Sequence, residues 1–244
     1  MKALCIEAGL EADKVTGYAK GYGYKGGKFK ETNHAWNVIK VDDQWRLFDV
    51  TWASGSGTEK NGKLVSQSSF EPFWFDVNPK AFIFTHLPDD SQWQLTGHAI
   101  TLEIYEKLSY LSSTFFQTGF DPGEIFNVAM TGKVKEFVEV SPTKFPLNAV
   151  NVPYTKFLIK NKILDLEIFS DYAGEIALIE DDKWNYFKKE NKKFSLRHTP
   201  TGKRVKISIK INSFDKSFYT ILTYKIVKRE KVTNANNVYQ DSGQ

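Results

Sequence analysis

The sequence predicts an α+β protein in two parts: helix and antiparallel sheet up to about residue 108, then an all-β region from about residue 123. Aromatic residues make up 15% of the 244 residues, with 19 Phe and 11 Tyr, a composition that favours strands over helical bundles. Apolar residues form 41% and charged residues 25%, as is typical of globular proteins. In the second part, runs such as "KEFVEV", "LDLEIFS" and "RVKISIKI" are separated by turn residues, which is typical of an antiparallel sandwich.

The first part is predicted to contain a helix, a strand and a hairpin, in that order. Apolar residues in "ALCIEAGLEA" have helical spacing, and Gly9 is placed to end the helix in a left-handed conformation. A short strand from Glu11 to Gly17 runs into the Gly- and Lys-rich loop "GYAKGYGYKGGKFK". The stretch "NHAWNVIKVDDQWRLFDVTW", residues 33–52, follows as a hairpin that turns at Asp42 and Asp43.

The rest of the first part alternates loops with aromatic segments. "ASGSGTEKNG" predicts a polar surface loop, and "FEPFWFDVNPKAFIFTHLPDD" predicts aromatic strands interrupted by proline. Ile100, Ile104 and Leu108 recur at four-residue steps and predict a helix. The run "FNVAMTG", further along, is predicted as the first of the β-rich segments.

These patterns predict a domain at residues 1–108, a linker at 109–122, an immunoglobulin-like sandwich at 123–230 and a disordered tail at 231–244. The net charge also differs between the first and second parts of the chain. Residues 1–150 hold 15 Lys and Arg against 18 Asp and Glu, whereas residues 151–230 hold 17 against 10, a net charge of +7. The basic sandwich is either a solvated lysine-rich face or a contact surface for an anionic partner, so the asymmetry mainly supports two domains.

The sequence argues against several functional classes. The net charge of +4 comes from mixed signs rather than a basic tract, so nucleic-acid binding is not expected. No run approaches the roughly 18 apolar residues of a transmembrane segment, and no signal-peptide pattern is present. The compartment stays open, because loss of an export signal upstream would leave a secreted or cell-surface protein. A single cysteine excludes an internal disulfide, and without metal-binding spacings neither a metal nor an organic cofactor is expected.

The hairpin is predicted to bring a histidine and an aspartate together. A two-residue turn at the Asp-Asp pair places His34 opposite Thr51 and Trp36 opposite Asp49. Directly paired residues point to the same face, and diagonal neighbours lie about 7 Å apart or less. His34 and Asp49 are therefore expected to share a face within hydrogen-bond reach, whereas a shift of the turn by one residue would separate them.

Such a pair has a known chemical use. A carboxylate that accepts the Nδ1–H of an imidazole holds the ring in one tautomer, and the other nitrogen then exchanges a proton with a nucleophile. Cysteine needs this partner because the thiolate attacks, and a neighbouring imidazolium favours the thiolate. The ordinary alternative is a strand histidine that pairs with a surface carboxylate.

A family resemblance favours the catalytic interpretation. "VTGYAKG" followed by "NHAWNVIKVDDQWRLFDVTWA" resembles the core of the transglutaminase-like superfamily, and "FDVNPKAFIFTHLPDDSQWQL" is similar to its kyphoscoliosis-peptidase branch. The resemblance covers residues 1 to about 108 and implies a papain-like arrangement, in which a helix carrying a cysteine packs on a small antiparallel sheet. His34 and Asp49 match the family's catalytic histidine and aspartate. The tryptophans at positions 36, 45 and 52 match flanking aromatic residues that are expected to pack.

The nucleophile is the part of the family pattern that this chain lacks. The family cysteine lies in a "G-x-C-x-G-Y-A" type segment at the start of the helix, whereas Cys5 matches a second, non-catalytic cysteine near the helix end. A helix C-terminus disfavours a thiolate, and free cysteine is usually a core residue, so Cys5 is expected to be buried and unreactive. The chain is therefore expected to be a fragment whose domain is incomplete at its N-terminus, or a fold kept without catalysis.

The function expected from the resemblance is cysteine-dependent acyl transfer on a protein or peptide, at a glutamine carboxamide or a peptide carbonyl, by a peptidase, deamidase or cross-linking enzyme. The chain by itself is expected to be inactive. The alternative is a non-catalytic module that binds a protein or a surface, and a carbohydrate-binding sandwich is a third possibility.

Other candidate residues carry weaker signals. His86 matches a family histidine for which a packing or hydrogen-bonding role is expected, while His98 and His198 have no companions for metal ligation. "GYGYKGG" lacks the order of a phosphate-binding loop and is expected to form a mobile rim beside the site. Asp89 and Asp90 are expected to form a solvated turn.

Overall fold

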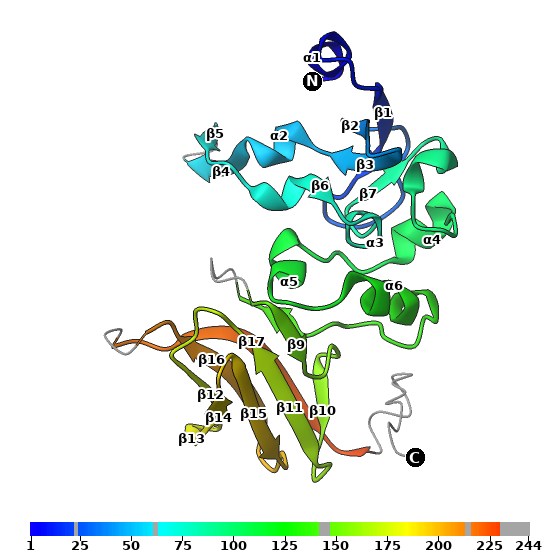
Figure 1. The fold of residues 1–244 in the computed structure, drawn as a ribbon. Coiled ribbons are helices and arrows are strands. Elements are labelled where there is room, and N and C mark those ends of the chain that lie inside the picture. The colour runs from blue at the N-terminus through cyan, green and yellow to red at the C-terminus, as the bar shows by residue number, and fades with distance from the viewer. Residues whose placement is uncertain (22–23, 61–62, 142–146, 213–215, 230–244) are drawn as a thin grey trace. The chain divides into compact units, whose positions relative to one another are not determined.

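The computed structural model describes residues 1–21, 24–60, 63–141, 147–212 and 216–229. The chain forms two compact units, Met1–Ser113 and Thr114–Gln244, which are described separately (Figure 1).

Unit 1 is built on a five-stranded antiparallel sheet in the order β6-β3-β2-β1-β7. Its strands are β1 (Ala12–Ala19), β2 (His34–Val41), β3 (Gln44–Phe48), β6 (Phe75–Val77) and β7 (His86–Pro88). Its α-helices are α1 (Lys2–Glu7), α2 (Val50–Ala53), α3 (Pro79–Phe82) and α4 (Leu102–Lys107), with 3-10 turns η1 (Pro72–Trp74) and η2 (Ser91–Gln94). The predicted helices at the start of the chain and after Ile100 are both present, and Gly9 follows the first with φ of 77°.

The predicted two-residue turn is correct. Asp42 and Asp43 have φ of 51° and 60°, and Val41 pairs with Gln44. The pairing of β2 with β3 stops at Asn37 opposite Phe48, however, so the expected pairs His34–Thr51 and Trp36–Asp49 do not form. The side chain of Asp49 instead accepts hydrogen bonds from the backbone of Thr51 and Trp52, which ends the strand and caps α2.

The two faces of the unit 1 sheet bury different clusters. Trp36 and Val38 pack with Val15 and Leu47 on one face, and the neighbouring Ile39 packs with Phe48 and Cys5 on the other. Because side chains alternate along a strand, His34 belongs to the face of Trp36. The chain is especially tight where β1 runs between β2 and β7, since a Cβ at Gly17 would collide with the Leu87 carbonyl and the Trp36 ring.

The expectation of a surface loop at "ASGSGTEKNG" is wrong over residues 55–60. This segment is β4 (Gly55–Lys60), which pairs with β5 (Lys63–Ser68), while residues 61 and 62 lie outside the described part. The segment is polar and lacks apolar alternation, so the sequence has no strand pattern there, and its pairing with β5 is what shows it to be a strand.

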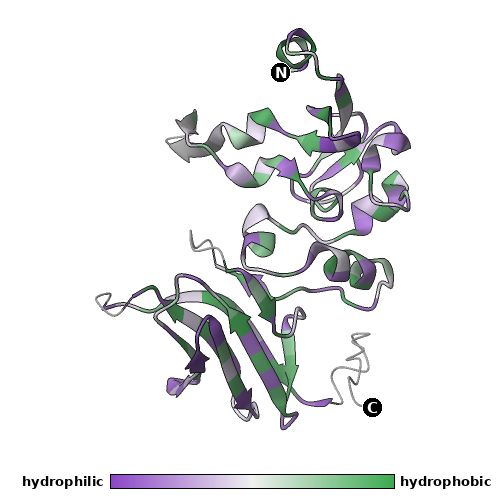
Figure 2. Ribbon diagram, viewed as in Figure 1, coloured by the Kyte–Doolittle hydropathy of each residue, from purple (hydrophilic) through white to green (hydrophobic). Residues whose placement is uncertain are grey.

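Unit 2 contains a six-stranded and a four-stranded sheet, consistent with a β-sandwich. The first follows the order β10-β17-β16-β12-β13 with β8 on β17, the second β14-β15-β11-β9, and the described pairs are antiparallel except β10–β17. The strands are β8 (Glu139–Val140), β9 (Ala149–Asn151), β10 (Phe157–Ile159), β11 (Leu164–Phe169), β12 (Glu175–Glu180), β13 (Lys183–Tyr186), β14 (Lys188–Glu190), β15 (Lys193–His198), β16 (Arg204–Lys210) and β17 (Tyr219–Val227). Figure 2 shows bands of alternating hydropathy along β11, where Leu164, Leu166 and Ile168 are buried.

Unit 2 begins with helices that the sequence did not predict. α5 (Ser113–Gln117) starts within the segment expected as a linker, and α6 (Pro122–Met130) replaces the strand expected at "FNVAMTG". The strand prediction is wrong because Asp121 caps the helix at the Glu124 N–H and the apolar residues are buried at helical spacing. The tail expected at 231–244 lies outside the described residues. Among the described helices, none has the length and apolar character required to cross a membrane.

Candidate active site

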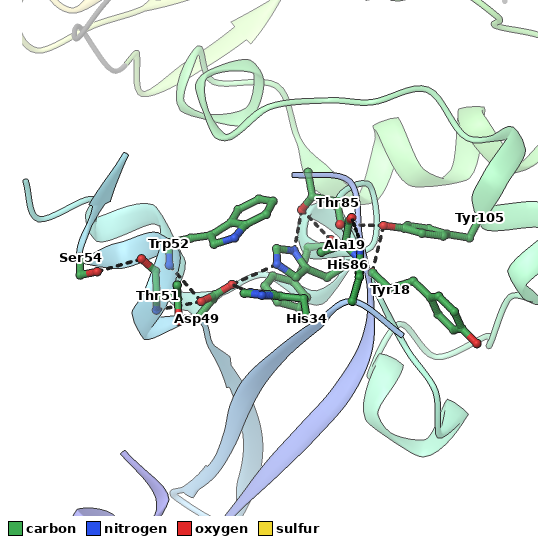
Figure 3. Close-up of polar contacts among 12 residues, drawn as sticks. Tyr18, Ala19, His34, Asp49, Thr51, Trp52, Ser54, Thr85, His86 and Tyr105 are labelled. Atoms are coloured by element: carbon green, nitrogen blue, oxygen red, sulfur yellow. Dashed lines mark hydrogen bonds and ion pairs between the residues drawn. The ribbon is translucent and has the colours of Figure 1, made fainter. Parts of the chain in front are cut away.

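The predicted histidine and aspartate meet at the end of the β2–β3 hairpin. The Nε2 atom of His34, the first residue of β2, lies 2.6 Å from the Oδ2 atom of Asp49 (Figure 3). The His34 side chain is 17% exposed and that of Asp49 is fully buried. The His34 ring is therefore partly accessible to solvent, and it is hydrogen-bonded to the buried carboxylate of Asp49.

Asp49 is surrounded by four donors. Its Oδ1 accepts hydrogen bonds from the backbone N–H groups of Thr51 and Trp52, at 2.9 and 3.0 Å, and its Oδ2 contacts His34 and His86. Burial by itself would raise the pKa of Asp49, but the hydrogen bonds from the two histidines outweigh it and hold the pKa well below the ordinary range. Asp49 is thus an ionised, fixed acceptor.

His86 is the second ring on this carboxylate, which agrees with the packing or hydrogen-bonding role expected for it, although its partner was not predicted. It is the first residue of β7 and is completely buried, with Nε2 3.1 Å from Asp49 Oδ2 and Nδ1 2.8 Å from Thr85 Oγ1. Burial lowers the pKa of His86 to about 4, so the ring is neutral at pH 7. A neutral ring that donates Nε2–H to the carboxylate has an acceptor at Nδ1, which lies 2.8 Å from the Thr85 hydroxyl; the Phe82 carbonyl, 3.1 Å from the same hydroxyl, is a second acceptor for its one hydrogen.

The structure corrects the ring nitrogen through which His34 meets its carboxylate. The contact uses Nε2 rather than the expected Nδ1. Within the described part of the chain, Nδ1 of His34 has no hydrogen-bond partner. This nitrogen is therefore the one available to exchange a proton with a reacting group.

Tryptophan rings enclose the triad of His34, Asp49 and His86. Trp52 lies 5.7 Å from the His34 ring and 4.3 Å from the His86 ring, measured between centroids. Trp36 is buried beside both histidines, and Trp45 packs on Trp93 at 5.0 Å. The packing role expected of the three tryptophans thus agrees with their positions. Such apolar walls strengthen the interactions of the carboxylate, because they keep water away from it.

A pocket of about 580 Å³ lies beside the exposed side of His34. Its lining includes His34 and Trp52, together with several residues of the segment "GYGYKGGKFK". Residues 22 and 23 of that segment lie outside the described part, so the expectation of a mobile rim remains a prediction. The pocket gives a substrate-sized space next to the histidine.

The triad also contains the atoms of a possible metal site. Ligand atoms of His34, Asp49 and His86 lie within 4.8 Å of one another. Both Nε2 atoms, however, already contact the same carboxylate oxygen at 2.6 and 3.1 Å. Ligands about 2.0–2.2 Å from a zinc ion in tetrahedral geometry stand farther apart than 2.6 Å, so the shorter contact would have to open. The geometry fits a hydrogen-bonded triad better than a metal site.

Comparisons with known proteins identify relatives of the chain. No family model matches it. It is 35% identical over 118 residues to Kyphoscoliosis peptidase of Mus musculus, which covers 48% of this chain and 18% of that protein. It is 32% identical over 131 residues to Hillarin of Drosophila melanogaster and 28% over 131 residues to the Lim and transglutaminase domain protein ltd-1 of Caenorhabditis elegans. Each of these matches covers 48% of this chain, but 16% of Hillarin and 17% of ltd-1. The chain is related to the kyphoscoliosis-peptidase branch of transglutaminase-like proteins. It spans less than a fifth of the length of these relatives.

Cys5, the one cysteine in the sequence, lies away from the triad. It is a buried residue of α1 and packs with Ile39 and Phe48, on the sheet face opposite to that of His34. The sequence expectation that Cys5 is a core residue agrees with this position.

The other two histidines, and the neighbouring Asp89 and Asp90, do not contact the triad. His98 is exposed, and His198 belongs to unit 2, where its Nε2 contacts Glu180 Oε2 at 2.5 Å. Asp90 caps η2 by accepting from Gln92 N–H, while Asp89 is exposed. Of the sequence candidates, the structure thus brings together His34, Asp49 and His86.

Proposed function

We propose that this chain supplies the base and the orienting carboxylate of a transglutaminase-like cysteine acyl-transfer site with a papain-like arrangement. The observation that carries the proposal is the contact of His34 Nε2 with the buried Asp49, which leaves Nδ1 available beside the pocket. The relatives support it, because the names of two of them refer to a peptidase and to a transglutaminase domain.

In the proposed reaction, a thiolate attacks the carbonyl carbon of a glutamine carboxamide or a peptide bond. The protonated His34 then gives the Nδ1 proton to the leaving amine, and a thioester remains. Asp49 stabilises the imidazolium and holds the ring in position, as the carboxylate does in other catalytic triads. In the second step, His34 takes a proton from water or from an amine, whose attack on the thioester releases the thiol. Water gives hydrolysis or deamidation, and an amine gives a cross-link.

The thiol is proposed to come from outside these 244 residues. The chain has one cysteine, and its position on the opposite sheet face leaves it unable to reach His34 without rearrangement of α1. The chain is therefore proposed to be an inactive piece of a longer enzyme.

The test compares this chain with a longer protein that includes the coding sequence upstream of Met1. We expect an upstream segment of the Gly-x-Cys-x-Gly-Tyr type, and release of ammonia or a new amine from a glutamine peptide only by the longer protein. His34→Ala should lower that activity by about 10²–10⁴-fold, the usual contribution of an acid–base group. Activity of the longer protein that survives His34→Ala would refute the proposal, as would turnover by the short chain that is lost in Cys5→Ser.

A non-catalytic binding module is the second candidate, and the position of Cys5 favours it. A stop codon or unrelated sequence upstream of Met1 would support this alternative, because no thiol would then be encoded beside the base. In that case the pocket beside His34 would bind a partner without transforming it.

A further inference from the structure

The pocket beside His34 has a pronounced charge. We call it the lysine pocket, because its lining includes Lys25, Lys28 and Lys30 together with Asn33, His34 and Trp52. Among the residues that the structure describes, no Asp or Glu belongs to the lining. The three lysines are exposed and form no ion pair with any described carboxylate. Their positive charge is therefore available to interact with an anionic group of a ligand in the pocket.

Three carboxylates near the lining segment do not themselves line the pocket. Asp49 is fully buried against His34, and Glu106 accepts the backbone N–H of Phe29 at its Oε1, at 2.7 Å. Glu31, next to Lys30 in sequence, is exposed and does not line the pocket.

Three lining residues of the lysine pocket, Tyr24, Phe29 and Asn33, make contacts within unit 1. The Phe29 ring stacks on Tyr24 and on Tyr105, at centroid distances of 5.2 and 5.8 Å. Asn33 bonds both the N–H and the C=O of Ala19, at 2.7 and 3.0 Å. Low-dielectric aromatic walls focus the field of the lysines towards the mouth of the pocket.

We propose that the lysine pocket binds an acidic segment of a protein substrate, with the side-chain carboxylates of that segment flanking the amide presented to His34. This inference rests on the proposed function and names the substrate class of the same site. The lysines select the substrate by charge, because their ammonium groups interact with carboxylates at the solvent-exposed edge of the pocket. Rim charges of this kind govern the association rate and the salt dependence of binding.

Binding of two short peptides to the 244-residue protein tests the inference without any need for a thiol. Both peptides carry a central glutamine, flanked by glutamates in one and by lysines in the other. We expect the acidic peptide to bind about tenfold or more tightly than the basic one, to perturb the NMR signals of His34 and Trp52, and to weaken as salt is raised. The triple variant Lys25→Gln, Lys28→Gln, Lys30→Gln should reduce the affinity for the acidic peptide about tenfold.

The matched control removes three exposed lysines from unit 2, in the variant Lys183→Gln, Lys203→Gln, Lys206→Gln. It has the same net charge as the pocket variant and should bind the acidic peptide as the unmodified protein does. Equal binding of the two peptides, absence of binding by both, or equal losses in the two triple variants would overturn the inference. Tighter binding of a short single-stranded DNA than of the acidic peptide would also overturn it. None of these outcomes depends on catalysis by the longer protein, so the proposed function is tested separately.

Discussion

At the scale of single residues, the site depends on what surrounds one carboxylate. Asp49 serves two roles at once, because its Oδ1 caps α2 while its Oδ2 receives both histidines. The buried His86 ring contacts the carboxylate from the protein interior, whereas His34 lines the pocket. The two rings therefore have the same partner but different environments, and of the two it is His34 that lines the pocket.

The first prediction concerns the acid sensitivity of His86. The unfolded chain protonates this ring below about pH 6.5, whereas burial keeps the folded ring neutral to about pH 4. The folded state binds fewer protons in this window, so acidification from pH 6.5 to 4 should lower the free energy of unfolding, by about 3 kcal/mol from this group. Urea titrations across that range, followed by tryptophan fluorescence, measure the loss.

The matched variant is His86→Gln, whose amide keeps a donor towards Asp49 but does not titrate. It should show a weaker pH dependence between pH 6.5 and 4. An unchanged pH dependence in this variant would show that His86 does not carry the effect.

The second prediction concerns Cys5. Because the thiol is buried against Ile39 and Phe48, alkylation by iodoacetamide at neutral pH should be much slower than in the urea-unfolded protein. Mass spectrometry over time gives the two rates. Rapid labelling of the folded protein would contradict both the burial and the exclusion of Cys5 as a nucleophile.

At the scale of elements, the β2–β3 hairpin and α2 together position His34 and Asp49. The hairpin turn fixes the register and so the side of the sheet on which His34 lies. The helix start then fixes Asp49, because the same side chain that ends β3 accepts the first free N–H groups of α2. The site is thus built at the transition between a strand and a helix.

The third prediction tests this transition. Asp49→Ala removes the cap and leaves the buried Nε2–H of His86 without an acceptor, so the free energy of unfolding should fall by about 3 kcal/mol. Urea unfolding followed by tryptophan fluorescence provides the measurement. The exposed Asp89→Ala should change it by less than about 0.5 kcal/mol. A loss no larger for Asp49→Ala than for Asp89→Ala would mean that the carboxylate does not organise the site.

At the scale of the whole molecule, the chain consists of two compact units that differ in their number of tryptophans. Five of the six tryptophans lie in unit 1, and Trp184 is the one in unit 2. Tryptophan fluorescence therefore reports mainly on the unit that holds the triad.

The fourth prediction is that substitutions in the two units act on separate transitions. Ile207→Ala in the core of unit 2 should destabilise that unit by about 2–5 kcal/mol and shift the β signal in circular dichroism, with little effect on the tryptophan transition. Val38→Ala, in the core of unit 1, should shift the tryptophan transition and only the part of the circular-dichroism signal that comes from the sheet of unit 1. A common shift of both signals in each variant would show that the units unfold as one.

The sequence by itself determined the features that depend on local patterns. The turn at Asp42 and Asp43 and the match to transglutaminase-like proteins were enough to predict the contact of His34 with Asp49, and the alternation of apolar residues was enough to predict strands in unit 2. The same local signals misjudged the β4–β5 hairpin, which has polar strands, and α6, whose "FNVAM" has the composition of a strand but the apolar spacing of a helix.

Only the tertiary structure decided how the site is completed. His86 reaches Asp49 because β7 pairs with β1 across the sheet, a contact 37 residues away in sequence that no local pattern encodes. The ring nitrogen of His34 that meets the carboxylate is also known only from the structure, and the separation of Cys5 from the triad depends on the face to which α1 packs. Each is set by long-range packing, whereas turns and strand periodicity are set by neighbouring residues.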